Sequence, residues 1–168
     1  MGSGLEEVLM ILEGSDDLKS ELLNNSFSDI DPINQDYGYR SKIIKTKKKN
    51  VQVDIHSQIS ITSEELENYK NENLALVFLC NNEDKNPIDF IKTKREAAKE
   101  LLNSVEAILY FKGDYTKEEK NENELKQFAE TNHISFYNVD KPQSLDVSLT
   151  EIVENCLIKA KKGSCYGF

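Results

Sequence analysis

Hydrophobic residues follow two patterns along this chain, and each pattern predicts one kind of element. Continuous apolar runs predict strands that are covered on both faces of a sheet. These runs lie at residues 5–12, 74–80 and 105–111. Apolar residues at helical spacing predict amphipathic helices. They lie at residues 18–25, 90–102, 125–129 and 152–160, and a short stretch at 134–139 predicts a further strand.

A pair of strands early in the chain has a different pattern. Between residues 50 and 57 every second residue is apolar, so one face of this strand is buried and the other is wetter. The preceding strand is expected at 37–46, and the lysines at 47–49 form the turn of a hairpin between the two. A short helix is expected at 63–69.

Strands and helices alternate along the rest of the chain. This order predicts an α/β fold with a mostly parallel six-stranded sheet and helices on both faces. The early hairpin adds one antiparallel edge strand. With 168 residues and no linker-like segment, a single domain is expected over 5–162, with short flexible tails at 1–4 and 163–168.

The composition restricts the classes of function. A net charge of −9 disfavours nucleic acid as a partner, because phosphate contacts require clustered lysine and arginine. The basic run between Arg40 and Lys49 is interpreted as a solvated hairpin tip, with partner docking as the alternative. Three cysteines without metal or disulfide spacing indicate a reducing, intracellular compartment. His56 and His133 lack a ligand pattern, so no metal site is expected.

The first strand and helix contain the most informative motif remnant. An apolar strand is followed by a tight turn and by Lys19-Ser20, which is the layout of a phosphate-binding loop opening a helix. Such a loop needs G-x-x-x-x-G-K-[ST], because only glycine lets backbone N–H groups close around phosphate oxygens. Glu13 and Leu18 occupy the two glycine positions here. The pattern predicts a nucleotide-binding fold whose nucleotide chemistry is eroded.

Further remnants follow in the same order along the chain. His56–Ser60 lies where a D-x-x-G motif would follow a third strand, Phe111-Lys-Gly-Asp114 is similar to N-K-x-D, and Val139-Asp-Lys141 is similar to S-A-K. With the length and the order of elements, these remnants resemble a small GTPase of the Ras superfamily, most closely its Rab branch.

The resemblance implies how a guanine nucleotide would be held. Lys19 would reach the outer phosphates and Ser20 would bind magnesium. Lys112 would lie along the guanine ring, and Asp114 would accept two hydrogen bonds from the base. Ordinary structural explanations compete with these roles, because Lys19-Ser20 can form a plain helical turn and Asp114 can cap a turn with Gly113.

The departures from the family concern hydrolysis and metal binding. Pro32 stands near the switch threonine that closes over magnesium, and it has neither a hydroxyl nor an N–H group. Ser57 and Ser60 replace the aspartate and glycine of D-x-x-G, and Ile61 falls where a glutamine would orient water. No catalytic residue and no metal ligand are therefore expected.

Electrostatics also disfavour a bound triphosphate. A carboxylate about 4 Å from a phosphate charge repels it by roughly 1 kcal/mol in water and by several kcal/mol in a cleft, and Asp16 and Asp17 could each do so. Lys19 would offset only ~1.5–3 kcal/mol. No cofactor is expected; the alternative is GTP or GDP without tight magnesium, held by Lys19, Ser20, Lys112 and Asp114.

The resemblance then implies a function through protein contacts. The sequence predicts a pseudo-GTPase acting as an interaction or structural subunit of a larger assembly of the trafficking or ciliary type. In the family the switches and the adjacent hairpin bind partners. The equivalent partner-binding residues here are Asp31, Pro32, Ile33, Tyr37, Ile59, Ile61 and Tyr69. Two alternatives stay open: a noncatalytic guanine-nucleotide binder, and an unrelated receiver or flavodoxin-like domain.

Cys165 is the candidate lipidation site. It lies four residues from the end, where a prenylated cysteine would lie, but Tyr166 and Gly167 are not aliphatic. Membrane attachment is expected only if Cys165 is lipidated. The expected location is cytoplasmic or cytoskeletal and ciliary, with peripheral attachment to a membrane less expected.

Overall fold

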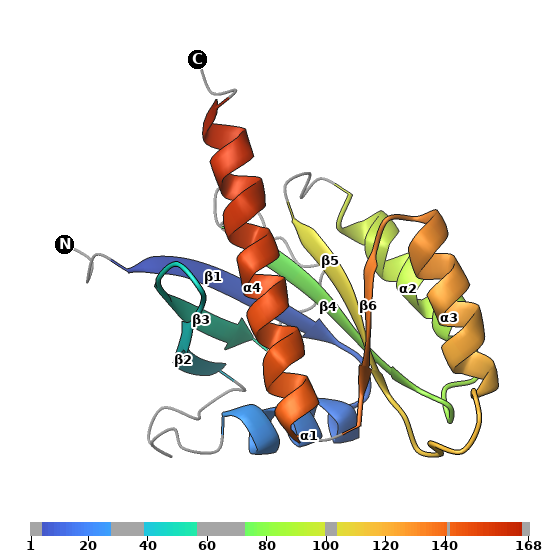
Figure 1. Cartoon of the computed structure of the whole chain (residues 1–168). Coiled ribbons are helices and arrows are strands. Elements are labelled where there is room, and N and C mark those ends of the chain that lie inside the picture. The colour runs from blue at the N-terminus through green and yellow to red at the C-terminus, as the bar shows by residue number, and fades with distance from the viewer. Residues whose placement is uncertain (1–4, 28–38, 57–72, 100–103, 141, 166–168) are drawn as a thin grey trace.

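A computed structural model describes residues 5–27, 39–56, 73–99, 104–140 and 142–165. Within these ranges the chain forms six strands and four helices (Figure 1). In chain order they are β1 (Glu6–Glu13), α1 (Asp16–Ser26), β2 (Tyr39–Lys45), β3 (Asn50–His56), β4 (Leu74–Asn81), α2 (Pro87–Ala97), β5 (Val105–Phe111), α3 (Lys120–Thr131), β6 (Ser135–Val139) and α4 (Pro142–Cys165).

The six strands form one sheet in the order β2-β3-β1-β4-β5-β6. Strands β3, β1, β4, β5 and β6 run parallel, and β2 pairs antiparallel with β3 at one edge. This arrangement confirms the predicted α/β fold with its antiparallel edge strand. The parallel strands end at a common edge of the sheet, where ligands bind in many open α/β folds.

Helices cover both faces of the sheet (Figure 1). On one face, side chains of α1 and α4, such as Leu22 and Ile152, pack against Val8, Met10 and Leu12 of β1. On the other face, residues of α2 and α3 pack with Leu9 and Ile11 from the same strand. Because neighbouring residues of β1 enter two different cores, the strand needs apolar side chains at successive positions.

The helices begin near the residues that the sequence indicates. Pro87 is the first residue of α2, where its missing N–H group costs no hydrogen bond. Helix α4 reaches Cys165, three residues past the end of the predicted domain at 162.

None of the helices in the described ranges is both long and apolar enough to cross a membrane. The expected helix at 63–69 lies outside the described residues, as do residues 101 and 102.

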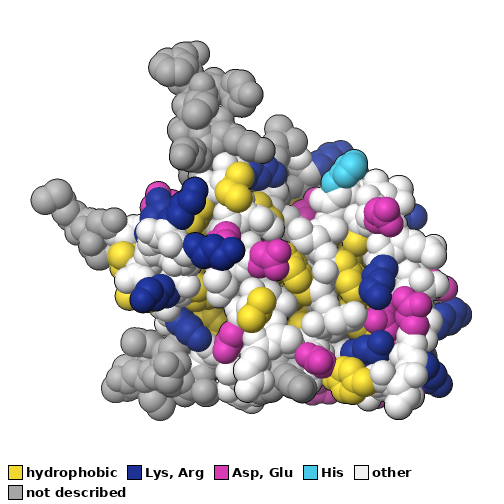
Figure 2. Space-filling view, in the orientation of Figure 1, with side chains coloured by type: hydrophobic (Ala, Val, Ile, Leu, Met, Phe, Trp, Pro, Cys, Tyr) yellow, Lys and Arg dark blue, Asp and Glu magenta, His cyan; other side chains and the backbone are white. Residues whose placement is uncertain are grey.

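The β2–β3 hairpin forms as predicted. Thr46 closes its turn, because its hydroxyl group donates to the carbonyl oxygen of Lys49 over 2.7 Å and accepts from the N–H of Lys49 over 3.2 Å. Lys47, Lys48 and Lys49 are exposed, and Figure 2 shows basic side chains gathered over this hairpin. The tip is therefore solvated, and its docking to a partner stays a prediction.

Candidate functional site

The connection between β1 and α1 contains only Gly14 and Ser15. Ser15 caps the helix, because its hydroxyl oxygen accepts the N–H of Leu18 over 3.3 Å. The N–H of Lys19 already donates to the carbonyl oxygen of Ser15 over 3.0 Å, as in a regular helix. The prediction that Lys19-Ser20 opens the helix is therefore wrong: these are its fourth and fifth residues.

Gly14 is required because the turn after β1 packs closely against β4. Its φ angle is +156°, and a Cβ atom at this position would lie 2.7 Å from the carbonyl oxygen of Leu79 and 2.8 Å from its Cβ. No side chain fits at such distances, so the backbone of the turn lies directly against β4. The glycine here serves this contact with Leu79.

Acidic side chains surround the start of α1. Asp16 and Asp17 are exposed in its first turn, where their charge stabilises the positive end of the helix dipole. Glu13, at the first glycine position of the phosphate-loop pattern, is buried at the end of β1, and its Oε2 lies 3.6 Å from Nζ of Lys94 on α2. The protein's own carboxylates thus lie next to a helix N-terminus, where the positive end of the dipole would favour a phosphate.

A small cavity lies where this turn meets the start of α2. Its volume is about 190 Å³, and Gly14, Ser15, Leu79 and Phe90 are among the residues that line it. Ligand pockets are usually roughly 300–1,000 Å³. The cavity adjoins the point between β1 and β4 where the sheet order reverses, and its volume is below this usual range.

The second half of the candidate site follows β5. Nζ of Lys112 lies 2.9 Å from Oε1 of Glu122 on α3, and only 14% of the Lys112 side chain is exposed. This hydrogen-bonded pair raises the pKa of Lys112. The lysine that the resemblance assigns to the guanine ring is therefore directed to α3 by an internal partner.

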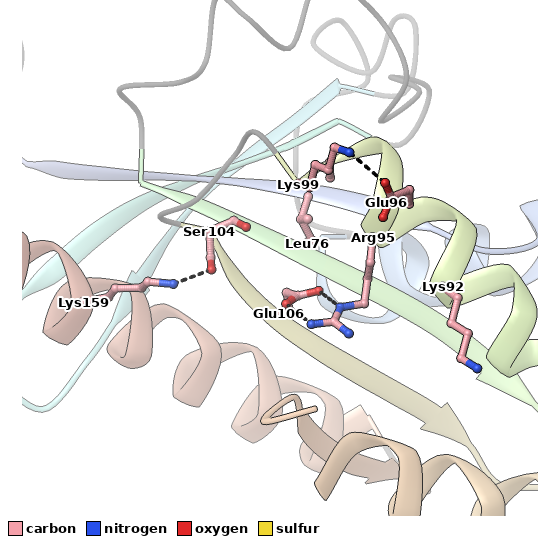
Figure 3. Close-up of a pocket in the computed structure, with 9 residues that line it drawn as sticks. Leu76, Lys92, Arg95, Glu96, Lys99, Ser104, Glu106 and Lys159 are labelled. Atoms are coloured by element: carbon pink, nitrogen blue, oxygen red, sulfur yellow. Dashed lines mark hydrogen bonds and ion pairs between the residues drawn. The ribbon is translucent and has the colours of Figure 1, made fainter. Parts of the chain in front are cut away.

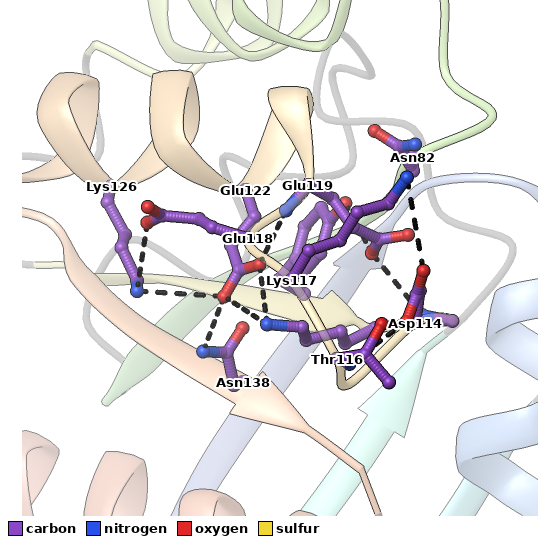
Figure 4. A network of polar contacts seen from close by, with 12 residues as sticks. Asn82, Asp114, Thr116, Lys117, Glu118, Glu119, Glu122, Lys126 and Asn138 are labelled. Carbon is purple, nitrogen blue, oxygen red and sulfur yellow. Dashed lines mark hydrogen bonds and ion pairs between the residues drawn. The ribbon is translucent and has the colours of Figure 1, made fainter.

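Glu122 is the centre of a buried polar network (Figure 4). Its carboxylate accepts hydrogen bonds from Lys112 Nζ, from the amide of Asn138 over 3.0 Å and from the N–H of Glu119 over 3.1 Å. Burial by itself would raise the pKa of Glu122, but these hydrogen bonds outweigh it and hold the pKa below its usual value. The carboxylate is therefore charged in the folded protein at neutral pH.

Glu119 ties the loop after β5 to the same network. One of its oxygens accepts the hydroxyl of Tyr110 over 3.0 Å and the N–H of Gly113 over 3.3 Å. Burial is the main cause that raises the pKa of Tyr110, and the hydrogen bond to Glu119 is the second. The hydroxyl group of Tyr110 is therefore protonated and neutral. Sequence reasoning missed Glu119 and Glu122; the signal was a Glu-x-x-Glu pair just before the apolar stripe of a helix, similar to a capping box.

Asp114 is engaged in a local turn. Its Oδ1 accepts the hydroxyl of Thr116 over 2.6 Å and the N–H of the same residue over 2.9 Å. These bonds, led by the hydroxyl, lower the pKa of Asp114. The carboxylate caps a turn, as the structural explanation anticipated, although the partner is Thr116. Its other oxygen lies 4.0 Å from Nζ of Lys117.

The predicted nucleotide residues come from two places at one edge of the sheet. Lys19 and Ser20 follow β1, whereas Lys112 and Asp114 follow β5, and β4 lies between these strands. Ser20 is exposed on α1. The predicted partner-binding residues Asp31, Pro32, Ile33, Tyr37, Ile59, Ile61 and Tyr69 lie outside the described residues. Cys165 ends α4, and its side chain is not described.

The described side chains include neither a reactive thiol nor a cluster of metal ligands. Cys80 and Cys156 are buried, and burial raises the pKa of each thiol to about 12. Such thiols are poor nucleophiles at neutral pH. Among the described residues, no cluster of three or more His, Cys, Asp or Glu side chains could bind a metal ion.

Comparison with known proteins adds no family assignment. No protein-family model matches the chain, and no curated protein is significantly similar to it.

Proposed function

We propose that this chain is a degenerate Rab-like domain that neither hydrolyses GTP nor switches with it. It serves as an interaction or structural subunit of a larger intracellular assembly of the trafficking or ciliary type. The observation that carries the proposal is the turn before α1. Two residues, Gly14 and Ser15, separate β1 from α1, so this turn is too short to wrap a phosphate chain.

The sheet supports the relationship to small GTPases. A flavodoxin-like or receiver domain has five parallel strands in the order 2-1-3-4-5. Here β2 is antiparallel to β3, and β1 lies between β3 and β4. The antiparallel strand after the first helix argues against these two alternatives and agrees with the fold that the resemblance implies.

The loop after β5 supports a domain without nucleotide. Lys112 is paired with Glu122, and Asp114 binds its own turn at Thr116. Guanine binding would have to compete with both internal contacts. Together with the acidic residues at the start of α1, this favours a scaffold over a noncatalytic nucleotide binder. The fold persists because its two cores are filled by side chains of the strands and helices.

The proposal is tested on the tagged full chain purified from cells of its source. Guanine nucleotide released by denaturation is quantified by chromatography, and co-purifying subunits are measured by size-exclusion chromatography and mass spectrometry. We expect less than a tenth of a nucleotide per chain and co-elution with partner subunits at a fixed stoichiometry. A monomer carrying one guanine nucleotide, with magnesium-dependent GTP turnover, would overturn the proposal.

A further inference from the structure

A second and larger cavity lies at the opposite end of the sheet. It is a cleft of about 510 Å³ beside the first residues of β5, the end of α2 and the C-terminal part of α4 (Figure 3). This volume is within the usual range of ligand sites. The buried side chains of Leu76 and Ala98 contribute apolar surface to it.

The charge of this cleft is opposite to that of the whole chain. Its lining contains four basic and two acidic side chains, so it has two net positive charges, whereas the chain has a net charge of −9. The basic residues are Lys92, Arg95, Lys99 and Lys159, and the acidic residues are Glu96 and Glu106. A local positive potential on an acidic protein attracts an anionic ligand to this one place.

Arg95 forms a rigid wall of the cleft. Its Nε and Nη2 donate to the two carboxylate oxygens of Glu106 over 2.6 and 3.2 Å, and Nη1 donates to the side-chain oxygen of Asn132 over 3.2 Å. The bidentate face that arginine uses to bind phosphate is therefore already occupied by a carboxylate. This disfavours a phosphate-specific pocket and leaves the lysines as the groups that meet a ligand.

The lysines come from separate segments around the rim. Nζ of Lys159 on α4 donates to the carbonyl oxygen of Ser104 over 2.7 Å, and Lys99 is paired with the exposed Glu96. The side chain of Lys92 makes no hydrogen bond or ion pair with any described residue, and it points away from Arg95 (Figure 3). Exposed contacts of this kind contribute only about 0–1 kcal/mol, so the lysines can exchange them for a ligand at little cost.

We propose that this cleft binds an acidic peptide segment of a protein partner. Point charges spread along a rim, with some apolar surface between them, suit carboxylates spaced along an extended peptide with one apolar side chain among them. The inference rests on the proposed function as an interaction subunit and names the chemistry of the partner. The site lies away from the edge of the sheet where a nucleotide would bind.

The test measures binding of a fluorescein-labelled octapeptide of glutamate and aspartate with one central leucine, by fluorescence anisotropy on the full chain. The cleft variant combines Lys92→Glu with Lys159→Glu. The matched control combines Lys47→Glu with Lys48→Glu at the exposed hairpin, which changes the net charge equally. We expect at least a tenfold weaker affinity for the cleft variant, less than a twofold change for the control, and weaker binding as salt rises.

Each other outcome overturns the inference. Absence of peptide binding at millimolar concentration, an equal loss in both variants, or no loss in the cleft variant would each do so. Inorganic phosphate is added at constant ionic strength; displacement of the peptide at low millimolar phosphate would show an anion site in place of a peptide site. Bound guanine nucleotide is measured on the same samples and tests the proposed function separately. A failure of peptide binding would overturn this inference alone, whereas bound nucleotide would overturn the proposed function.

Discussion

Nζ of Lys112 and the carboxylate of Glu122 form an ion pair in which the acidic side chain is only 1% exposed. The pair links the loop after β5 to the first turn of α3. Removing one member of a buried pair leaves the remaining polar groups without a partner. The free-energy cost of this loss is larger than the stabilisation that the intact pair provides. The pair therefore fixes the shape of the loop to which the resemblance assigns guanine contacts.

Replacing Glu122 with glutamine should destabilise the protein. The amide cannot accept all the hydrogen bonds that Lys112, Asn138 and the N–H of Glu119 donate to the carboxylate. We expect a loss of about 1–3 kcal/mol in the free energy of unfolding, measured with urea. Glu124→Gln on the exposed part of α3 is the control and should change it by less than about 0.5 kcal/mol.

The same variant should change the dependence of stability on pH. The pKa of Glu122 is lower in the folded protein than its ordinary value of 4.5, so its contribution is present above pH 4.5 and is lost as the pH falls through the folded-state pKa. Glu122→Gln should flatten the loss of stability below pH 4.5 relative to the unaltered chain. Parallel curves for both proteins would show that Glu122 is not held charged by this network.

Gly14→Ala should be strongly destabilising. The new methyl group would lie 2.7 Å from the carbonyl oxygen of Leu79, and the φ angle of +156° is unfavourable for alanine. We expect a cost of about 2–4 kcal/mol from overpacking and backbone strain. Gly113→Ala is the matched control, since its Cβ would meet only a carboxylate oxygen of Glu119 at 3.7 Å. Equal effects of the two substitutions on the urea midpoint would contradict the packing of Gly14 on β4.

Alanine substitutions at Ser15 and Ser20 distinguish two interpretations of the start of α1, a capped structural helix and a phosphate-binding loop. Ser15→Ala removes the cap on Leu18 and should lower stability by about 0.5–2 kcal/mol. Ser20→Ala, at the position that the resemblance assigns to magnesium, should change stability by less than about 0.5 kcal/mol. Thermal unfolding of both variants, with and without magnesium and GTP, checks this order.

Cys80 and Cys156 should resist modification in the folded protein. Both thiols are buried, with pKa values raised to about 12, so little thiolate is present or accessible at pH 8. In a Cys165→Ser background we expect no labelling by iodoacetamide over an hour, and two labels after unfolding in urea. Rapid labelling of one thiol in the native protein would show that its core is open.

The sequence predicts the sheet well for a physical reason. Strands β1, β4 and β5 enter a core on each face, so their apolar runs are continuous and easily recognised. The start of α1 differs from the prediction because Lys19-Ser20 matches the end of a phosphate-binding motif, which places the helix start too late. The local signal, Ser15 followed by Asp16 and Asp17, is that of an N-cap and an acidic first turn, and the structure follows it.

The polar network after β5 could not be predicted from the sequence. Glu119 and Glu122 lie in a stretch rich in lysine, glutamate and asparagine, which indicates a solvated surface. Their burial depends on Tyr110 and Lys112 from β5 and its loop, and on Asn138 from β6. The Glu-x-x-Glu spacing marks the start of α3, but these contacts exist only once the strands have paired, so the spacing does not reveal them.

Thermal unfolding with guanine nucleotide tests the central claim most directly, namely that the phosphate and base sites are filled by the protein's own side chains. A ligand present at 100 times its dissociation constant stabilises a protein by about 2.7 kcal/mol, which corresponds to roughly 5–10 °C for a domain of this size. With 1 mM GTP or GDP and magnesium we predict a shift below about 1 °C. A rise of several degrees that disappears in Asp114→Ala would contradict the account.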